Sequence, residues 1–197
     1  MLRELGPAEF LGELDSLVAI YADAMTADPA LLPGRSELMR RHATYPSFRA
    51  VAARETPGGP VVGFGYGFHG ASGQWWYDAV RAALVSVAGH TSARAWLSDS
   101  VEVAELHVNP RHQRAGIGSQ MLLALTCGRP ERTALLSTPD RESPARRLYR
   151  RAGFADLVTG YSFPGGGPPY AVMGATLPLR DPAAADDLPA PASPSIW

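Results

Sequence analysis

Apolar and polar positions along this chain follow two periods, one typical of strands and one typical of helices. From Val101 to Val108 the apolar residues fall mainly at every second position, which predicts a strand that Asn109 and Pro110 end. Directly afterwards the spacing changes to steps of three and four, which predicts a helix with one buried face. That face consists of Ile117, Met121, Leu122 and Leu125.

The same patterns predict the remaining elements in chain order. Leu2 to Leu5 is expected to be a short first strand, and helical spacing runs from Pro7 to Met25. A second short helix is expected from Ser36, as its N-cap, to Tyr45, after a loop at Asp28-Pro29 and Pro33-Gly34. The other elements are strands over Phe48 to Ala53, Val61 to Phe68, Arg132 to Thr138, Asp156 to Thr159, Tyr161 to Phe163 and Tyr170 to Leu177, and a helix that starts at Ser143-Pro144.

The strand at Val61 to Phe68 carries glycine at every second position. Gly63, Gly65 and Gly67 therefore share one face, where another backbone or a ligand is expected to lie close. The opposite face is aromatic and is predicted to belong to the core. It consists of Phe64, Tyr66 and Phe68.

A turn with the features of an anion site joins the strand at Val101 to Val108 to the helix after it. Gln113 to Gly118 presents unpaired backbone N–H groups at a helix N-terminus, where the helix dipole also favours negative charge. Gly116 and Gly118 have no Cβ, so a phosphate can approach the backbone closely. Arg111 and Arg114 add positive charge. A loop without a ligand is the alternative if this turn is considered alone.

Two other phosphate-binding motifs differ from this turn. A dinucleotide fingerprint needs a small residue three positions after its second glycine, where this chain has Met121. A P-loop needs Gly-Lys-Ser/Thr, and all 18 basic residues here are arginine. The P-loop is therefore excluded.

The composition indicates a globular domain and excludes several classes of protein. The chain has 197 residues, 46% of them apolar, and a net charge of −1, which gives no field that would favour nucleic acid or an anionic membrane. Cys127 is the only cysteine, so intramolecular disulfides and Cys-rich metal sites are excluded, no metal site is predicted, and a buried inert thiol is expected. Acids near the N-terminus, and the lack of a long apolar stretch, predict a soluble cytoplasmic protein without a signal peptide. One domain is expected over residues 1–180, followed by a disordered Pro- and Ala-rich tail over 181–197.

The strand, the Gln-x-x-Gly-x-Gly turn and the apolar helix together resemble the acetyl-CoA-binding motif of the Gcn5-related N-acetyltransferase (GNAT) family. A second segment, Ser143 to Phe154 (SPARRLYRRAGF), resembles that family's later helix and the Gly-Phe entry to its last hairpin. The resemblance covers Leu2 to Leu177, and these two segments are its specific parts. It implies an α/β fold with a mixed, mostly antiparallel sheet of six or seven strands flanked by helices.

The resemblance also implies acetyl-CoA as co-substrate, bound where the fourth and fifth strands splay apart. Backbone groups of Leu106 and Val108, with His107 between them, are expected to bind the pantetheine arm. Relatives often have an asparagine contact near Glu142, and this contact is not carried over. The amides expected to hold the pyrophosphate are those of Gln113, Arg114, Ala115, Gly116, Ile117, Gly118 and Ser119.

Acetyl transfer to an amine requires a general base, because an alkyl ammonium has a pKa of about 10. Glu102 and Glu105 are the candidates. They are three residues apart, so on a regular strand they face opposite sides and only one would serve, although a bulge would change this parity. His107 is a weaker candidate, for which a hydrogen-bonded structural role is expected.

Tyr149 is the candidate general acid. It occupies the position in ARRLYRRAGF where the family holds the tyrosine that meets the coenzyme sulfur, and a phenol can protonate a departing thiolate. The alternative is an aromatic residue packed in the core. Because the chain has no lysine, lysine self-acetylation and Schiff-base chemistry are excluded.

About thirty residues, Gly70 to Ser100, separate two strands that a short turn can join in the family. They include GQWWYDAVRAALVSVAG, whose spacing predicts an amphipathic helix. Trp75 and Trp76 either anchor this inserted helix or form a wall of the acceptor pocket, and both interpretations stay open. The Gly- and Pro-rich segment Pro164 to Pro169 is expected near the substrate side.

The leading hypothesis is an acetyl-CoA-dependent N-acetyltransferase that acts on a primary amine of a small molecule by direct attack. Alternatives are acetylation of a protein N-terminus and a non-catalytic acyl-CoA-binding sensor. The acids near the pocket suit cationic amines, whereas the aromatic residues suit aryl-amines. The oligomeric state is left open, with a homodimer as one option.

Overall fold

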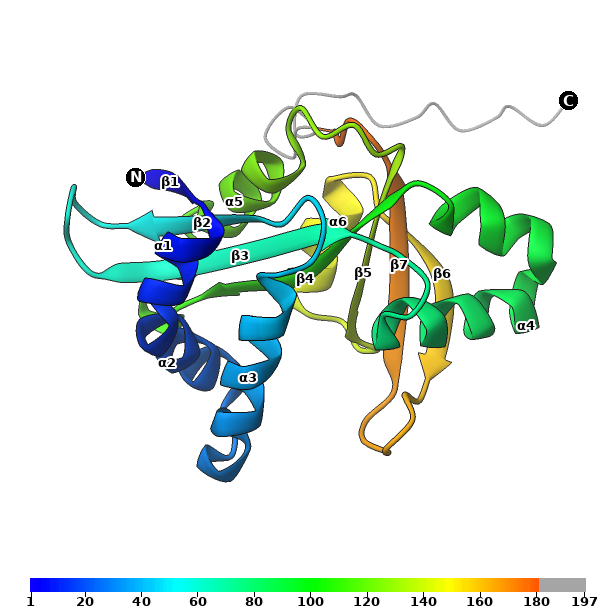
Figure 1. The fold of residues 1–197 in the computed structure, drawn as a ribbon, viewed down its shortest axis with the longest axis horizontal. Helices are drawn as coiled ribbons and strands as arrows, with labels where there is room; N and C mark the ends of the chain where they lie inside the picture. The colour runs from blue at the N-terminus through cyan, green and yellow to red at the C-terminus, as the bar shows by residue number, and fades with distance from the viewer. Residues whose placement is uncertain (181–197) are drawn as a thin grey trace, which may run out of the picture.

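One sheet of seven strands, in the order β1-β2-β3-β4-β5-β7-β6, organises the protein (Figure 1). The computed structural model describes residues 1–180. The strands are β1 (Leu2–Leu5), β2 (Arg49–Arg54), β3 (Val61–His69), β4 (Ser100–Val108), β5 (Thr133–Pro139), β6 (Ala155–Tyr161) and β7 (Tyr170–Thr176). The helices are α1 (Pro7–Gly12), α2 (Leu14–Met25), α3 (Leu32–His42), α4 (Trp75–Leu97), α5 (Ile117–Thr126) and α6 (Pro144–Arg151), with 3₁₀ turns η1 (Pro29–Leu31) and η2 (Pro110–His112).

The parallel pair β4 and β5 is the exception in an otherwise antiparallel sheet. Their pairing extends only from Ser100 opposite Thr133 to Glu102 opposite Leu135. Beyond these residues the two strands diverge, and Figure 1 shows β4 running across the view while β5 and β7 run down it. The predicted mixed, mostly antiparallel sheet flanked by helices is confirmed, and the splay lies between the fourth and fifth strands.

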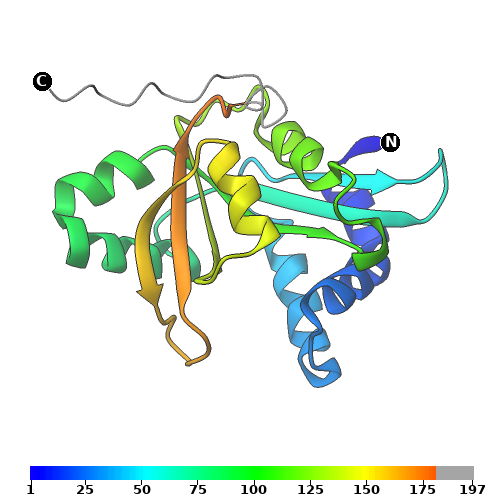
Figure 2. The same cartoon turned by 180° about the vertical axis from the view of Figure 1, so that it is seen from behind.

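Helices cover both faces of the sheet. In Figure 1 the helices α1 to α3 lie in front of one half of the sheet and α4 lies in front of the other half, while Figure 2 shows α5 and α6 on the opposite face. The front layer buries Phe10, Leu17 and Met39 against the aromatic side chains of β3. Within residues 1–180, none of the helices combines the length and the apolar character that crossing a bilayer requires.

The two faces of β3 differ as predicted. Phe64, Tyr66 and Phe68 are buried in the front layer. On the other face, a Cβ on Gly65 would lie 2.9 Å from a methyl group of Leu125, which belongs to α5. The glycines therefore allow α5 to pack directly on the strand, and a helix rather than a ligand occupies the space above Gly65.

Several predicted boundaries at the N-terminal end were wrong. The helical stretch from Pro7 to Met25 is two helices, which separate at Glu13. The next helix begins at Leu32, with Pro33 and Gly34 in its first turn, so Ser36 lies inside the helix and is not its N-cap. Proline is tolerated in the first turn, where its missing N–H would have no partner in any case.

Three further predictions are corrected in the second half of the chain. The two short strands expected at Asp156 to Thr159 and Tyr161 to Phe163 form the single strand β6, whose pairing is irregular. The inserted helix is longer than expected and breaks at Gly89, where φ is 80°, so α4 consists of two arms. Cys127 is exposed rather than buried, because it follows the last residue of α5. The predicted disordered tail at residues 181–197 lies outside the described residues.

Candidate active site

A β-bulge in β4 brings the two candidate bases to the same face of the sheet. Glu105 pairs with Tyr66 and Glu102 pairs with Phe68, but Val103 pairs with Gly67, so Ala104 is the extra residue. Tyr66 and Phe68 share the front face of β3, and their partners on β4 therefore share it too. Glu102 and Glu105 were expected to face opposite sides only on a regular strand, and the bulge changes this parity.

Glu105 is a fully paired carboxylate. Its Oε1 accepts a hydrogen bond of 2.6 Å from Nη1 of Arg35, and its Oε2 lies 2.5 Å from Nε2 of His107. Burial raises the pKa of Glu105, but the hydrogen bond from His107 and the positive charges of His107 and Arg35 outweigh it, so that the pKa lies below its usual value. Glu105 therefore stays ionised at neutral pH.

Arg35 connects α3 to β4 through its ion pair with Glu105. Its Nη2 donates a hydrogen bond of 3.0 Å to the hydroxyl of Tyr21, and its guanidinium lies 4.5 Å from the centre of the Tyr21 ring. Burial lowers the pKa of Arg35, but the Glu105 charge, together with smaller contributions from Tyr21 and Tyr66, outweighs burial and raises the pKa above its usual value, so the guanidinium is held in its charged form. The ion pair thus joins the helical layer to the strand that carries both glutamates.

Glu102 differs sharply from Glu105. It is 6% exposed, and its Oε2 has no hydrogen-bond partner among the described residues. Burial first, and the Glu105 charge second, raise the pKa of Glu102 to about 8. A carboxyl group that gains and loses its proton near pH 8 suits proton transfer near neutral pH.

A second polar pair lies beside the glutamates. Nδ1 of His42 is 3.0 Å from the hydroxyl of Tyr66. Burial lowers the pKa of His42 to about 4, so the imidazole is neutral at pH 7. The sequence did not predict site roles for His42, Tyr66, Tyr21 or Arg35. The pattern around these residues indicates only a helix face, a core strand or a loop, and no motif contains them.

The turn between β4 and α5 has the geometry of an anion site. The amides of Gln113 to Ser119 have no hydrogen-bond partner within residues 1–180. Arg114 and Gly116 have positive φ angles of 66° and 77°, which reverse the chain before α5 begins. A Cβ on Gly116 would meet no atom within 4 Å, so the space over this backbone is open. Arg111 and Arg114 are exposed beside it, and the residues present fit a pyrophosphate.

Tyr149 belongs to the core on the face of the sheet opposite the glutamates. It lies on α6, which the Ser143 side chain caps by accepting a hydrogen bond from the amide of Arg146. Tyr149 is buried against Phe154 with ring centres 5.8 Å apart. Burial, and next the Glu105 charge, raise its pKa above the usual value. The phenol therefore holds its proton at neutral pH and lies within electrostatic range of Glu105.

The two tryptophans of α4 have different surroundings. The indole Nε1 of Trp76 donates a hydrogen bond of 3.0 Å to Oγ of Ser137 on β5. Trp75 is 60% exposed and packs on Phe163, with ring centres 5.5 Å apart. Trp76 thus anchors α4 to the sheet, whereas Trp75 presents an aromatic surface to solvent.

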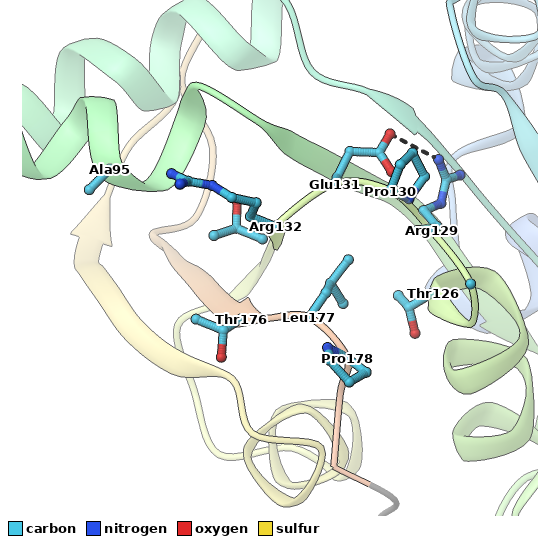
Figure 3. A pocket seen from close by; sticks show the side chains of 11 residues that line it. Ala95, Thr126, Arg129, Pro130, Glu131, Arg132, Thr176, Leu177 and Pro178 are labelled. Atoms are coloured by element: carbon cyan, nitrogen blue, oxygen red, sulfur yellow. Dashed lines mark hydrogen bonds and ion pairs between the residues drawn. The ribbon is translucent and has the colours of Figure 1, made fainter.

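A cavity of about 670 Å³ lies elsewhere, at the end of β4 and β5 where the two strands still pair (Figure 3). The buried ion pair of Arg129 and Glu131 forms part of its wall. Arg129 also donates to the backbone carbonyl groups of Leu125, Ser47 and Gly67, which is a structural role. None of the predicted site residues lines this cavity.

Comparisons with known proteins extend the resemblance beyond single motifs. The family model of the acetyltransferase (GNAT) domain matches residues 50–156. The GCN5-like protein acetyltransferase Rv2170 of Mycobacterium tuberculosis is 34% identical over 202 residues, which cover 90% of this chain and 98% of the relative.

Two solved structures share the fold. A GNAT-family acetyltransferase of Desulfovibrio desulfuricans matches with a TM-score of 0.62 at 15% identity, covering 89% of this chain and 98% of its own. YncA of Salmonella typhimurium, solved with its cofactor acetyl-CoA, matches with a TM-score of 0.58 at 16% identity, covering 90% and 93%. The sheet with its splay, the matching family model and the mycobacterial relative agree, and this chain belongs to the GNAT family of acetyltransferases.

Proposed function

We propose that this protein transfers the acetyl group of acetyl-CoA to a primary amine, with Glu102 as general base and Tyr149 as general acid. The observation that carries the proposal is the bulge at Ala104, which places an unpaired buried carboxyl group beside a fully paired one. Both glutamates lie on the strand that borders the splay. Their environments separate their pKa values, as expected for two acids with different roles.

The chain's own groups would hold acetyl-CoA on both sides of the splay. The unpaired amides of Gln113 to Ser119 would bind the pyrophosphate, with Arg111 and Arg114 as additional positive charges. Backbone groups from Leu106 to Val108 would bind the pantetheine arm, because β5 does not pair with this part of β4. When bound, acetyl-CoA supplies the activated thioester.

Glu102 is the better candidate for the base. The amine must lose a proton, and Oε2 of Glu102 is free to accept it, whereas both oxygens of Glu105 already accept hydrogen bonds. The raised pKa of about 8 makes the ionised Glu102 a stronger base than an ordinary carboxylate. Glu105 instead supplies the negative charge that helps to raise this pKa, and Arg35 and His107 hold it in place.

Tyr149 is the proposed acid because its hydroxyl keeps its proton at neutral pH. From α6 it approaches the splay from the face opposite Glu102, so that the base and the acid lie on either side of the reacting atoms. A proton from the phenol would neutralise the departing thiolate sulfur. This arrangement separates proton removal at the amine from proton delivery at the sulfur.

The proposed acceptor is a primary amine of a small molecule. A second candidate is an amine of a protein, favoured by the mycobacterial relative, which is described as a protein acetyltransferase. Trp75 and Trp76 are proposed to border the acceptor site, because α4 begins on the sheet face that carries Glu102.

The test is calorimetric titration with acetyl-CoA, followed by assays of thiol release with small amines, polyamines and lysine-containing peptides. Binding together with release is the expected result, and the preferred acceptors distinguish the two candidates. Binding without release from any amine would contradict catalysis and favour an acyl-CoA-binding sensor. A failure to bind would contradict the pyrophosphate site.

A further inference from the structure

An exposed group of aromatic side chains joins the start of α4 to the β6–β7 hairpin. Phe163 lies at its centre, with ring centres 5.5 Å from Trp75, 4.8 Å from Tyr161 and 5.5 Å from Tyr170. We name these four residues the aromatic surface. Trp75 is largely exposed, and the other three are half-buried, so their rings are accessible without rearrangement of the core.

The aromatic surface lies at the end of the sheet where β4 and β5 have separated. Tyr170 pairs with Pro139, the last residue of β5, and with Tyr161 of β6. Figure 1 shows the β6–β7 hairpin and the start of α4 at this lower end of β5. An acceptor that enters the splay from this end passes the aromatic surface.

The start of α4 packs on the same face of the sheet that carries the two glutamates. Trp76, next to Trp75, bonds to Ser137, which lies two residues beyond Leu135, the partner of Glu102. Alternate residues of a strand share a face, and two residues span about 6.6 Å. The start of α4 therefore packs on the sheet face that carries Glu102, two residues along β5 from the strand partner of Glu102.

Within the described part of the chain, the two glutamates offer only one unpaired carboxyl group to an acceptor with several ammonium groups. Both oxygens of Glu105 are already bound by Arg35 and His107. Glu102 is buried, and within residues 1–180 its Oε2 has no hydrogen-bond partner, so of the two glutamates it is the one free to accept the amine proton.

Resting on the proposed function, we propose that the acceptor carries its amine next to an aromatic or large apolar group and that this group binds to the aromatic surface. Polycationic amines are then expected to be poor acceptors. The amine reaches Glu102 while its neighbouring group packs on Phe163 and Trp75. The same chemistry occurs in a free arylalkylamine and in a lysine that follows an aromatic residue in a peptide. These two sources are distinguished by experiment.

The test compares matched acceptors by thiol release. Phenethylamine is compared with ethylamine, a blocked Phe-Lys peptide with a blocked Ala-Lys peptide, and spermidine is the polycation. Within at least one pair, kcat/KM should favour the aromatic member about tenfold or more, the factor for burying roughly half of an aromatic side chain. The pair that shows the preference identifies the source. Ratios near one in both pairs, or spermidine as the best acceptor, would overturn the inference.

Variants assign the preference to the aromatic surface. Phe163→Ala should reduce the aromatic-to-aliphatic ratio severalfold, with acetyl-CoA affinity as the check that the domain is folded. Val87→Ala, an exposed position on α4 outside the aromatic surface, is the control and should keep the wild-type ratio. An unchanged ratio in Phe163→Ala would overturn the inference.

A binding measurement separates this inference from the proposed function. Phenethylamine and the blocked Phe-Lys peptide are each titrated into the CoA-loaded wild-type protein and into the CoA-loaded Phe163→Ala variant. If no amine gives thiol release but either ligand binds and loses affinity in the variant, the acceptor inference stands and the catalytic proposal fails. If neither ligand binds the wild-type protein, the acceptor inference fails.

Discussion

Glu102 and Glu105 have the same side chain and opposite pKa shifts, and the difference comes from their neighbours. Both are buried, which alone raises the pKa of a carboxyl group. Glu105 has Arg35 and His107 as hydrogen-bond donors, whereas Glu102 has the Glu105 charge nearby and an oxygen without a partner among residues 1–180. At the residue scale, the positive charges are placed so that one acid is stabilised as an anion and the other is not.

This difference predicts opposite effects of two glutamine substitutions on stability. The folded-state pKa of Glu102 is raised to about 8, so its stabilising contribution is present below pH 4.5 and is lost as the pH rises to about 8. Glu102→Gln should therefore increase the free energy of unfolding at pH 9, by up to about 5 kcal/mol, and change it little at pH 4.

Glu105→Gln is the matched comparison. Its folded-state pKa is lowered, so its contribution is present above the usual carboxyl pKa and is lost as the pH falls. This variant should be destabilised at pH 9. Urea unfolding of both variants and the wild type at the two pH values measures these changes. A Glu102→Gln protein that is less stable than the wild type at pH 9 would disagree with a raised pKa.

At the scale of elements, the turn between β4 and α5 can be tested by itself. Gly116 has a φ of 77°, and the amides on both sides of it have no partners within the described chain. Gly116→Glu places a strained side chain and a negative charge where the pyrophosphate is proposed to bind, and should weaken acetyl-CoA binding at least a hundredfold.

Ala82→Glu, an exposed position on α4, adds the same charge away from the turn and should bind acetyl-CoA like the wild type. Calorimetric titration measures both affinities. Wild-type affinity in Gly116→Glu would remove the turn from the binding site.

Periodicity predicted the elements well where one face of each is buried. The glycine face and the aromatic face of β3 follow directly from alternation, and the GNAT motifs placed the turn, α5 and α6 correctly. Helix limits were less predictable near Ser36, because proline in a first turn and proline in a loop look alike in sequence. The break of α4 at Gly89 had no signal apart from one glycine.

The candidate site was predictable only in part. Glu102, Glu105 and Tyr149 could be named from their positions in motifs, but the bulge at Ala104 decides how the two glutamates face, and bulges have no sequence pattern of their own. Arg35 comes from a helix distant in sequence and reaches β4 only through tertiary packing. No spacing rule connects residues 70 positions apart.

At the scale of the whole molecule, the splay is where side chains from the two faces of the sheet are proposed to act together. The glutamates come from the front face and Tyr149 from α6 on the opposite face. The pairing of β4 with β5 ends at Glu102 and Leu135, so Glu102 lies at the edge of the splay and Glu105 lies beyond it. A continuous sheet would isolate the proposed base from the proposed acid.

Tyr149→Phe tests this arrangement. It removes one hydroxyl and keeps the ring that packs on Phe154, so the fold and acetyl-CoA binding should be maintained. If the hydroxyl donates the proton to the sulfur, kcat should fall about a hundredfold or more. Steady-state kinetics and calorimetry measure the two effects. Wild-type kcat in this variant would leave Tyr149 as a core aromatic residue.

The measurement that tests the central claim most directly is the pH dependence of kcat/KM for acetyl transfer in the wild type, Glu102→Gln and Glu105→Gln. The wild-type rate should rise through an inflection near pH 8, because Glu102 must lose its proton to act as the base. Glu102→Gln should lose this inflection and about a hundredfold or more in rate. Glu105→Gln should keep the inflection but move it to lower pH, since it removes the neighbouring negative charge. An unchanged profile in Glu102→Gln would contradict the account.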